Sequence, residues 1–313
     1  MTQGEEQLYD KREVDTDHVK CAGCGANMEF DPASQKLVCR HCGRTEELEK
    51  QFGAPELDYL KGLDACEQWD GETVVFRCEN CGAKVLLDRA QTAKLCPFCG
   101  TAHVVEAGEQ AGIKPTALLP FAFDKDAAVQ RCKAWAKKGW LAPRKFRKRM
   151  SPDSVNGVYT PCFTFDSNTF SRYEGRIGKR HTRVVGSGKN RRTETYIVWR
   201  NISGTFSNRF DDVLVTAGRM MSQKNMEALQ PYDTNRGCLF EEEYMLGFMA
   251  YRYETGLSEL WKDARDIIDQ RLRGMILGQY VYDCVGYLNV STSHENVTYK
   301  YVMLPVWAVS YTH

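Results

Sequence analysis

Four Cys-x-x-Cys pairs constrain this chain more than any other feature of its sequence. Residues 21–43 and 78–100 form a repeated unit of 23 residues, the copies begin 57 positions apart, and nine positions are identical. Each copy places 14 residues between its two cysteine pairs and a glycine directly after each pair. A spacing that recurs in two copies indicates metal binding by both units.

This spacing is typical of a zinc ribbon. Two residues between cysteines let one tight turn present both thiolates to one ion, and zinc takes four such ligands at about 2.3 Å. The glycine can adopt the positive φ that turns backbone amides toward sulfur. We therefore expect two Zn²⁺ ions per chain, one held by Cys21, Cys24, Cys39 and Cys42 and the other by Cys78, Cys81, Cys96 and Cys99.

Redox chemistry, iron binding and histidine ligands are the alternatives to two Cys₄ zinc sites. Redox-active pairs begin a helix in a βαβ unit, and no such pattern surrounds these pairs. Iron stays an alternative, because residues 96–100 read Cys-Pro-Phe-Cys-Gly, as in rubredoxin-type sites. His41 and His103 adjoin ligand cysteines, but each set already has four sulfurs, which also predicts a structural role for each ion. The remaining cysteines, expected to be buried and inert, are Cys66, Cys132, Cys162, Cys238 and Cys284.

Composition divides the chain into small units and one larger domain. Residues 1–18 are acidic without apolar periodicity, which predicts a disordered tail. We expect the first ribbon at residues 19–45, a helical connector at 46–74, the second ribbon at 75–106 and a mixed α+β domain at 107–313. The fold class is therefore α+β, with two tandem Cys₄ zinc ribbons before the larger domain.

Periodicity predicts the elements of the larger domain. The strands are expected at residues 118–123, 158–165, 193–206, 280–290 and 297–311, with a turn at 186–188. The helices are expected from an Asp124 N-cap to about residue 138, with Ala128, Cys132 and Trp135 on one face, then at 241–251 and 257–275. A helix followed by Pro161–Phe165 parallels a helix followed by Pro305–Val309, so an internal duplication is one of two open alternatives.

Composition also bounds location and partners. Apolar residues make up 42% of the chain, and no apolar run approaches the 18 residues that a membrane helix needs. No signal peptide is evident at the N-terminus, so we expect a cytoplasmic protein without membrane insertion. The net charge is only +1, which does not favour a dedicated polyanion binder. The charges are nevertheless segregated, with ten basic and one acidic residue in 125–150, nine and two in 171–200, and three and eight in 241–270.

Motifs of enzymes are not found. The segment around Gly188 and Lys189 departs from the phosphate-binding loop, because Asn190 stands where a hydroxyl is required. There is no nucleophile elbow and no His-Glu-x-x-His motif, and Asp211-Asp212 is interpreted as a loop or cap. We therefore expect a non-enzymatic protein.

A basic stretch interleaved with Trp135, Trp140 and Phe146 suits either a solvated helix face or contacts with nucleic acid. The candidate nucleic-acid contacts are Lys133, Lys137, Lys138, Arg144, Lys145, Arg147, Lys148 and Arg149, with Arg191 and Arg192 in a second basic segment, residues 172–192.

The two ribbons, the segment Leu119–Ala128, the strand Gly157–Phe163 and the closing Leu304–Trp307 together resemble a bacterial family of TFIIB-type zinc-ribbon proteins. Members are often labelled primosomal protein N′-like or replication-restart-helicase-like, although the ATP-binding motor of such helicases is absent from this sequence. The resemblance implies a zinc-binding adaptor linked to phage-shock-protein-A-like and flotillin-like (SPFH) membrane-stress proteins. A nucleic-acid-binding accessory protein of replication or transcription is the alternative, and protein partners are expected. The oligomeric state stays open.

Overall fold

The computed structural model describes residues 20–26, 28–64, 73–78, 84–88, 104–106, 113, 115–138, 155–218, 221–229, 232, 237–251, 253 and 255–309. The described part is mixed α+β and mostly sheet. No helix in it is long and apolar enough to cross a membrane. The predicted disordered tail, residues 1–18, lies outside the described residues.

A small antiparallel sheet contains the first cysteine unit. It has three strands in the order β1-β2-β3, with β1 at Met28–Asp31, β2 at Lys36–Cys39 and β3 at Thr45–Glu47. Met28, Phe30 and Leu37 point to its buried side. The turn from β1 to β2 is closed by Asp31, whose side chain accepts hydrogen bonds from the backbone N–H and the hydroxyl of Ser34.

A ten-stranded sheet forms the body of the molecule. Its main path runs β11-β8-β13-β9-β12-β6-β5-β7, while β10 pairs with β9 and β4 pairs with β13. The short strands are β4 (Leu57–Asp58), β5 (Thr73–Cys78), β6 (Lys84–Asp88), β7 (Val104–Glu106), β8 (Ala117–Leu118), β11 (Cys238–Leu239) and β12 (Met249–Tyr251). Strand β6 lies within the second cysteine unit, and β5 and β7 adjoin that unit in the chain. The three strands pair with one another and are joined to the rest of the large sheet through β12.

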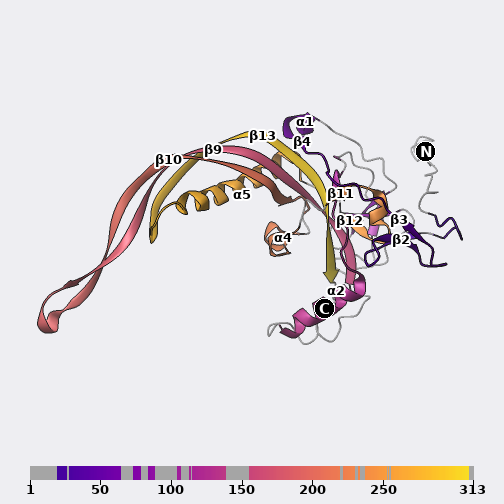
Figure 1. The fold of residues 1–313 in the computed structure, drawn as a ribbon, viewed down its shortest axis with the longest axis horizontal. Coiled ribbons are helices and arrows are strands. Elements are labelled where there is room, and N and C mark those ends of the chain that lie inside the picture. The colour runs from indigo at the N-terminus through magenta and orange to yellow at the C-terminus, as the bar shows by residue number, and fades with distance from the viewer. Residues whose placement is uncertain are drawn as a thin grey trace, which may run out of the picture.

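Three very long strands give the molecule its shape. They are β9 (Val155–Val185), β10 (Arg192–Thr216) and β13 (Cys284–Val309), and β9 lies between the other two. Beyond the body they form a curved arm, and α5 (Leu257–Leu277) lies along its concave side (Figure 1). The β9–β10 hairpin continues past the first residue of β13, so the end of the arm has two strands. Its tip is the turn at residues 186–191, which contains a short 3₁₀ helix, η3 (Gly188–Asn190).

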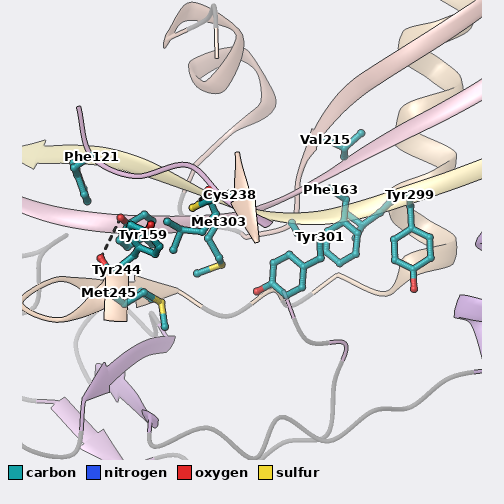
Figure 2. Close-up of a cluster of buried hydrophobic side chains, with 14 of the residues drawn as sticks. Phe121, Tyr159, Phe163, Val215, Cys238, Tyr244, Met245, Tyr299, Tyr301 and Met303 are labelled. Atoms are coloured by element: carbon teal, nitrogen blue, oxygen red, sulfur yellow. Dashed lines mark hydrogen bonds between the residues drawn. The ribbon is translucent and has the colours of Figure 1, made fainter. Parts of the chain in front are cut away.

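Aromatic side chains fill the core where the arm meets the body. Phe163 stacks on Tyr301 with ring centroids 4.8 Å apart, and Phe121 meets Tyr159 edge-on at 5.1 Å. Figure 2 shows these rings gathered between the sheet and the segments beside it, where the hydroxyl of Tyr159 donates to the Tyr244 carbonyl oxygen. Stacked and edge-on rings on adjacent strands stabilise both the packing and the pairing register.

The structure confirms several predicted elements. Helix α2 (Lys125–Lys138) begins after Asp124, whose side chain accepts a hydrogen bond from the Ala127 backbone N–H, and α5 includes the whole of the predicted helix 257–275. The hairpin turn lies where Gly186 predicted it, at a φ of 92°. The prediction of which face of α2 is buried is partly wrong. Ala128, Val129 and Ala136 are buried, whereas Trp135 is 66% exposed.

Other predictions need correction. The predicted connector at 46–74 is helical, within its described part, only in α1 (Tyr59–Asp64). Phe52 instead forms an isolated antiparallel β-bridge with Cys238, and the Leu239 N–H donates to the Gln51 carbonyl. Residues 51–52 are therefore extended along the body. The predicted helix 241–251 is a 3₁₀ turn, η5 (Glu242–Met245), followed by β12, because Gly247 turns the chain at a φ of 88°.

Strand lengths also differ from prediction. Strand β8 ends at Leu118, before Pro120, which has no N–H for a ladder. The two predicted C-terminal strands are one strand, β13, with an irregularity between Glu295 and Thr298. Pro161–Phe165 and Pro305–Val309 lie in β9 and β13, which pair antiparallel; an internal duplication stays a prediction.

Candidate metal centre

Two similar turns bring the cysteines of the first unit together. In each, the glycine after the pair donates its backbone N–H to the carbonyl of the first cysteine, from Gly25 to Cys21 at 2.8 Å and from Gly43 to Cys39 at 2.9 Å. Both glycines have positive φ, 73° and 77°, as the sequence predicted. Because an L-residue with a Cβ rarely adopts this conformation, glycine is what permits the turns to close.

The four sulfurs form one cluster. The Sγ atoms of Cys21, Cys24, Cys39 and Cys42 all lie within 4.8 Å of one another. Cys21 Sγ is 3.5 Å from Cys42 Sγ, and Cys24 Sγ is 3.5 Å from Cys39 Sγ. Four sulfurs at about 2.3 Å from one ion would be about 3.8 Å apart at tetrahedral corners. The cluster therefore fits a single metal ion, and exposed His41 is not among its members.

Backbone amides favour thiolate at three of the four sulfurs, and at two of these the pKa is lowered overall. The N–H of Cys42 is the main cause that lowers the pKa of Cys39 to about 6, and the N–H of Gly23, 3.4 Å from Cys21 Sγ, lowers the pKa of Cys21. At Cys24 the amide of Ala26 also favours thiolate, but hydrogen bonding with Cys39 and burial raise its pKa to about 12. Four adjacent thiols therefore cannot all lose their protons easily, because the thiolate charges repel one another. A bound divalent cation would lower the pKa of each thiol and so favour four thiolates.

The cysteine unit is fastened to the body. The Phe30 N–H donates to the Leu246 carbonyl at 3.0 Å, and the Gln35 side-chain amide donates to the Phe121 carbonyl at 2.8 Å. The Phe30 ring meets Tyr244 edge-on, with centroids 5.2 Å apart. An ion that held this sheet would therefore also hold the surface that packs against the body.

The second predicted set is described only in part. The backbone of Cys78 ends β5, and Cys81, Cys96 and Cys99 lie outside the described residues, as does His103. Strand β6 begins 56 positions after β1, close to the 57-residue repeat, and pairs antiparallel with β5. Of the two cysteine units, the first alone shows a cluster of sulfurs within the part of the chain that the structure describes.

The predicted nucleic-acid contacts fall in two places. Lys133 is exposed on α2; Lys137 and Lys138 belong to the same helix, and their side chains are not described. Arg191 and Arg192 are exposed at the tip of the arm, where Arg192 pairs with Glu194 at 2.8 Å. Arg144, Lys145, Arg147, Lys148 and Arg149 lie outside the described residues.

Of the five single cysteines, Cys162 and Cys238 are buried as predicted, and burial raises the pKa of both thiols. Cys132 and Cys284 are half-buried, and Cys66 lies outside the described residues.

A charged cluster that the sequence did not reveal lies at the base of the arm. Lys300 on β13 places Nζ 2.7 Å from Glu56 Oε1 and 2.8 Å from Asp212 Oδ1, and the Asp212 N–H donates to Asp166 at 2.8 Å. Burial alone would lower the pKa of Lys300, but its two carboxylate partners outweigh burial and raise it. The three carboxylates could geometrically hold a metal ion, but the lysine ammonium already supplies the cation.

Asp212 was interpreted from the sequence as part of a loop or cap, and this is wrong: it lies within β10. Alternation of apolar and polar residues did not place Asp212 in a strand, because a β-bulge interrupts the alternation between Phe210 and Val213. Asp212 adopts a φ of 52° in this bulge.

Comparison with known proteins places the chain in a family. It is 30% identical over 310 residues to a protein of Bacillus subtilis (strain 168) described as "Uncharacterized protein YdjG", covering 94% of this chain and 83% of that protein. The chain belongs to the YdjG family. No family model matches it, and no solved structure matches it. The likeness to YdjG extends over the cysteine unit, the body and the arm, since 94% of the chain is covered.

Proposed function

We propose that this protein is a non-enzymatic, cytoplasmic adaptor in which two zinc-held ribbons and the α+β body present surfaces to macromolecular partners. The proposal is supported first by the donor set. Cys21, Cys24, Cys39 and Cys42 supply four sulfurs to one point, which completes the usual coordination of zinc and makes the ion structural. Thiolate sulfur favours zinc or iron over magnesium or calcium.

The arm is the observation that carries the adaptor role. It extends from the body as a sheet of three and then two strands, with α5 on one side only (Figure 1). Near its end the exposed large apolar side chains include Val184, Tyr196, Ile197, Val198 and Trp199. Soluble proteins rarely keep apolar groups exposed together unless they contact something else. A projecting sheet of this kind suits contact with another macromolecule.

The resemblance to TFIIB-type zinc-ribbon proteins supports the same role and its link to phage-shock-protein-A-like and SPFH proteins. The second zinc ion is proposed for Cys78, Cys81, Cys96 and Cys99 on the strength of the repeated sequence. An internal duplication of the α+β domain is part of the same proposal.

Metal analysis tests the zinc sites directly. The purified full chain is expected to contain two equivalents of zinc, and Cys21→Ser/Cys39→Ser and Cys78→Ser/Cys96→Ser are each expected to retain one. Cys238→Ala, which removes a buried thiol outside both sets, is the matched control and should keep both. Iron in place of zinc, or equal loss in the control, would refute the assignment.

The adaptor role is tested by tagged full-length protein expressed in its native cell. A protein partner that co-purifies in a fixed ratio, and is lost on deletion of residues 179–198 or with the cysteine variants, supports it. Purified protein that turns over ATP, or that carries no stoichiometric partner, contradicts it.

Nucleic-acid binding is a second candidate because one observation favours it. Residues 179–200 of the hairpin carry seven Lys or Arg and one acidic residue, Glu194. Exposed cations on a two-stranded ribbon can neutralise phosphates. Filter binding of duplex DNA and of RNA across a salt series tests it. Affinity that falls steeply from low to physiological salt supports binding, and retention no greater than that of a neutral protein refutes it.

A further inference from the structure

Within the part of the chain that the structure describes, the outer edge of β10 has no strand partner along the arm. Among the described strands, β10 pairs only with β9, from Arg192 opposite Val185 to Thr216 opposite Cys162. An edge strand presents a row of backbone N–H and C=O groups that another strand can pair with. The other edge of β9 pairs with β13, and β13 pairs in turn with β4 and β8 of the body. The long open edge of β10 is therefore a surface for strand addition.

The sequence of this edge lacks the features that usually block pairing. Native edge strands are protected by charges, proline or a covering element. Residues 195–208 contain one charged residue, Arg200, and no proline. Residues 195–201 are exposed on both faces of the strand, so α5 does not cover them. The segment is also rich in the β-branched and aromatic residues that favour extended structure.

Neighbouring glycines leave room for the apolar side chains here to lie close to β9 and β13. A Cβ at Gly178 would lie 2.5 Å from Ile197 Cγ2 and 3.1 Å from Trp199 Cε3, and a Cβ at Gly286 would lie 3.0 Å from Trp199 Cζ3. The indole therefore lies across β9 toward β13, with the Arg176 guanidinium carbon 5.3 Å from its ring centre. Trp199 stays 38% exposed, and Ile197 39%. An added strand would meet apolar side chains that are packed on one side and exposed on the other.

Charge determines which strand fits. The segment 179–200 carries seven basic residues and Glu194, which is already shared by Arg183 at 3.2 Å and Arg192 at 2.8 Å. Two copies paired edge to edge would bring two such cationic segments together, and like charges on adjacent strands oppose pairing. A segment rich in Asp and Glu would be attracted.

We propose that the outer edge of β10, at residues 195–201, binds an extended acidic segment of a partner protein by strand addition. This inference rests on the proposed adaptor function and specifies the chemistry of its partner. Backbone hydrogen bonds to the edge provide affinity, and alternate side chains on the two faces provide selectivity. Acidic groups of the added strand would lie beside Arg200 and Arg192.

Two other occupants are less well supported by the observations. An anionic membrane would have to admit the tip first, and the tip, Gly-Ser-Gly-Lys-Asn-Arg at 186–191, is polar and cationic rather than apolar. Duplex DNA would use the cations but leave the open backbone edge of β10 unused. Both are outcomes of the test.

The test uses the metal-loaded full chain and fluorescent peptides of about ten residues, a usual strand length. The first probe alternates glutamate with threonine and valine. The second has the same sequence with N-methyl groups on alternate residues, which keep its charge but remove the hydrogen-bond donors. The first peptide is expected to bind at least about tenfold more tightly by fluorescence anisotropy. A lysine-for-glutamate peptide should not bind.

Protein variants locate the surface. Arg200→Glu on β10 is expected to weaken binding of the acidic peptide at least about tenfold. Arg180→Glu makes the same charge change on β9, the partner strand of β10, and should weaken binding less. Circular dichroism and zinc content confirm that both variants are folded.

Four results would overturn the inference. They are equal binding of the methylated and unmethylated peptides, equal effects of the two variants, tighter binding to duplex DNA or to phosphatidylglycerol-containing vesicles than to the peptide, and concentration-dependent self-association blocked by Arg200→Glu. If any of these occurs while a protein partner still co-purifies, strand addition fails and the adaptor role stands. If no partner co-purifies either, both fail.

Discussion

Replacing Lys300 should destabilise the base of the arm more than an ordinary surface lysine would. Its side chain is 12% exposed and contacts Asp212, which is 14% exposed, and Glu56, which is 34% exposed. Lys300→Met keeps the aliphatic stem but removes the ammonium, leaving the half-buried Asp212 and the more exposed Glu56 without their cation beside the buried Asp166. Removal of one partner of a buried ion pair costs about 3–5 kcal/mol. Glu56 can turn toward water, so we expect the lower end, about 3 kcal/mol.

Urea unfolding followed by tryptophan fluorescence measures this loss. Lys36→Met is the matched control, because Lys36 pairs with Glu47, which is 80% exposed, and such surface pairs contribute about 0–1 kcal/mol. Adding Asp212→Asn to Lys300→Met should recover at least about 1 kcal/mol, because it removes one of the uncompensated charges. A Lys300→Met variant no less stable than Lys36→Met would refute the reasoning.

Three further predictions follow from the same structure. Burial is the main cause that raises the pKa of Asp166 to about 6. The free energy of unfolding therefore includes the full contribution of the protonated Asp166 carboxyl below its ordinary pKa of 3.8 and loses it as the pH rises through about 6. Asp166→Asn should therefore be more stable than wild type at pH 8 and no more stable at pH 3. The gain at pH 8 should be at most about 2 kcal/mol, because solvent screens the carboxylate. The urea midpoints of both proteins at pH 3 and pH 8 check this. Phe30→Ala should cost about 3–5 kcal/mol and expose β1–β3 to hydrogen exchange while zinc is retained, with exposed Phe52→Ala as the control. Gly178→Ala should displace Ile197 and Trp199 and shift the tryptophan emission, whereas Gly188→Ala, in open space at the tip, should not.

The cysteine site was within reach of the sequence. The repeat predicted which four sulfurs come together, and the glycines indicated the turns that present them, because both signals are local in the chain. Gly25 and Gly43 adopt the predicted positive φ. The helix at 257–275 was also predictable, since a long amphipathic period depends on neighbouring residues alone.

The arm was not predictable in its full length for a physical reason. Residues 166–185 carry polar or charged side chains on much of both faces, so the apolar alternation that identifies a strand is weak there. Pairing with β10 and β13 holds this segment extended, and those partners lie far away in sequence. The helix expected at 241–251 failed likewise, because β12 finds partners in β6 and β9 that override local preference.

The direction of the arm is set where two β-bulges face each other across β9. On β10 the register shifts between Phe210 and Val213, opposite Asp166, and on β13 it shifts between Glu295 and Thr298, opposite Ser167. Asp212 and Asn296 take φ values of 52° and 51° there, a conformation that Asp and Asn tolerate better than most residues. A bulge bends and twists its strand, so a pair of them on both sides of one strand turns the whole sheet.

Lys300 and Asp212 join β13 to β10 at this turn, and Asp212 is hydrogen-bonded to Asp166 on β9 between them. The charged cluster therefore links the strands that carry the two bulges, and we expect the arm to keep its angle to the body only while the cluster is intact. Loss of Lys300 should then change the angle of the arm as well as stability. The distribution of distances between spin labels at the exposed positions 189 and 61 should broaden in Lys300→Met and stay narrow in Lys36→Met. An unchanged distribution in Lys300→Met would show that the bulges alone fix the angle of the arm.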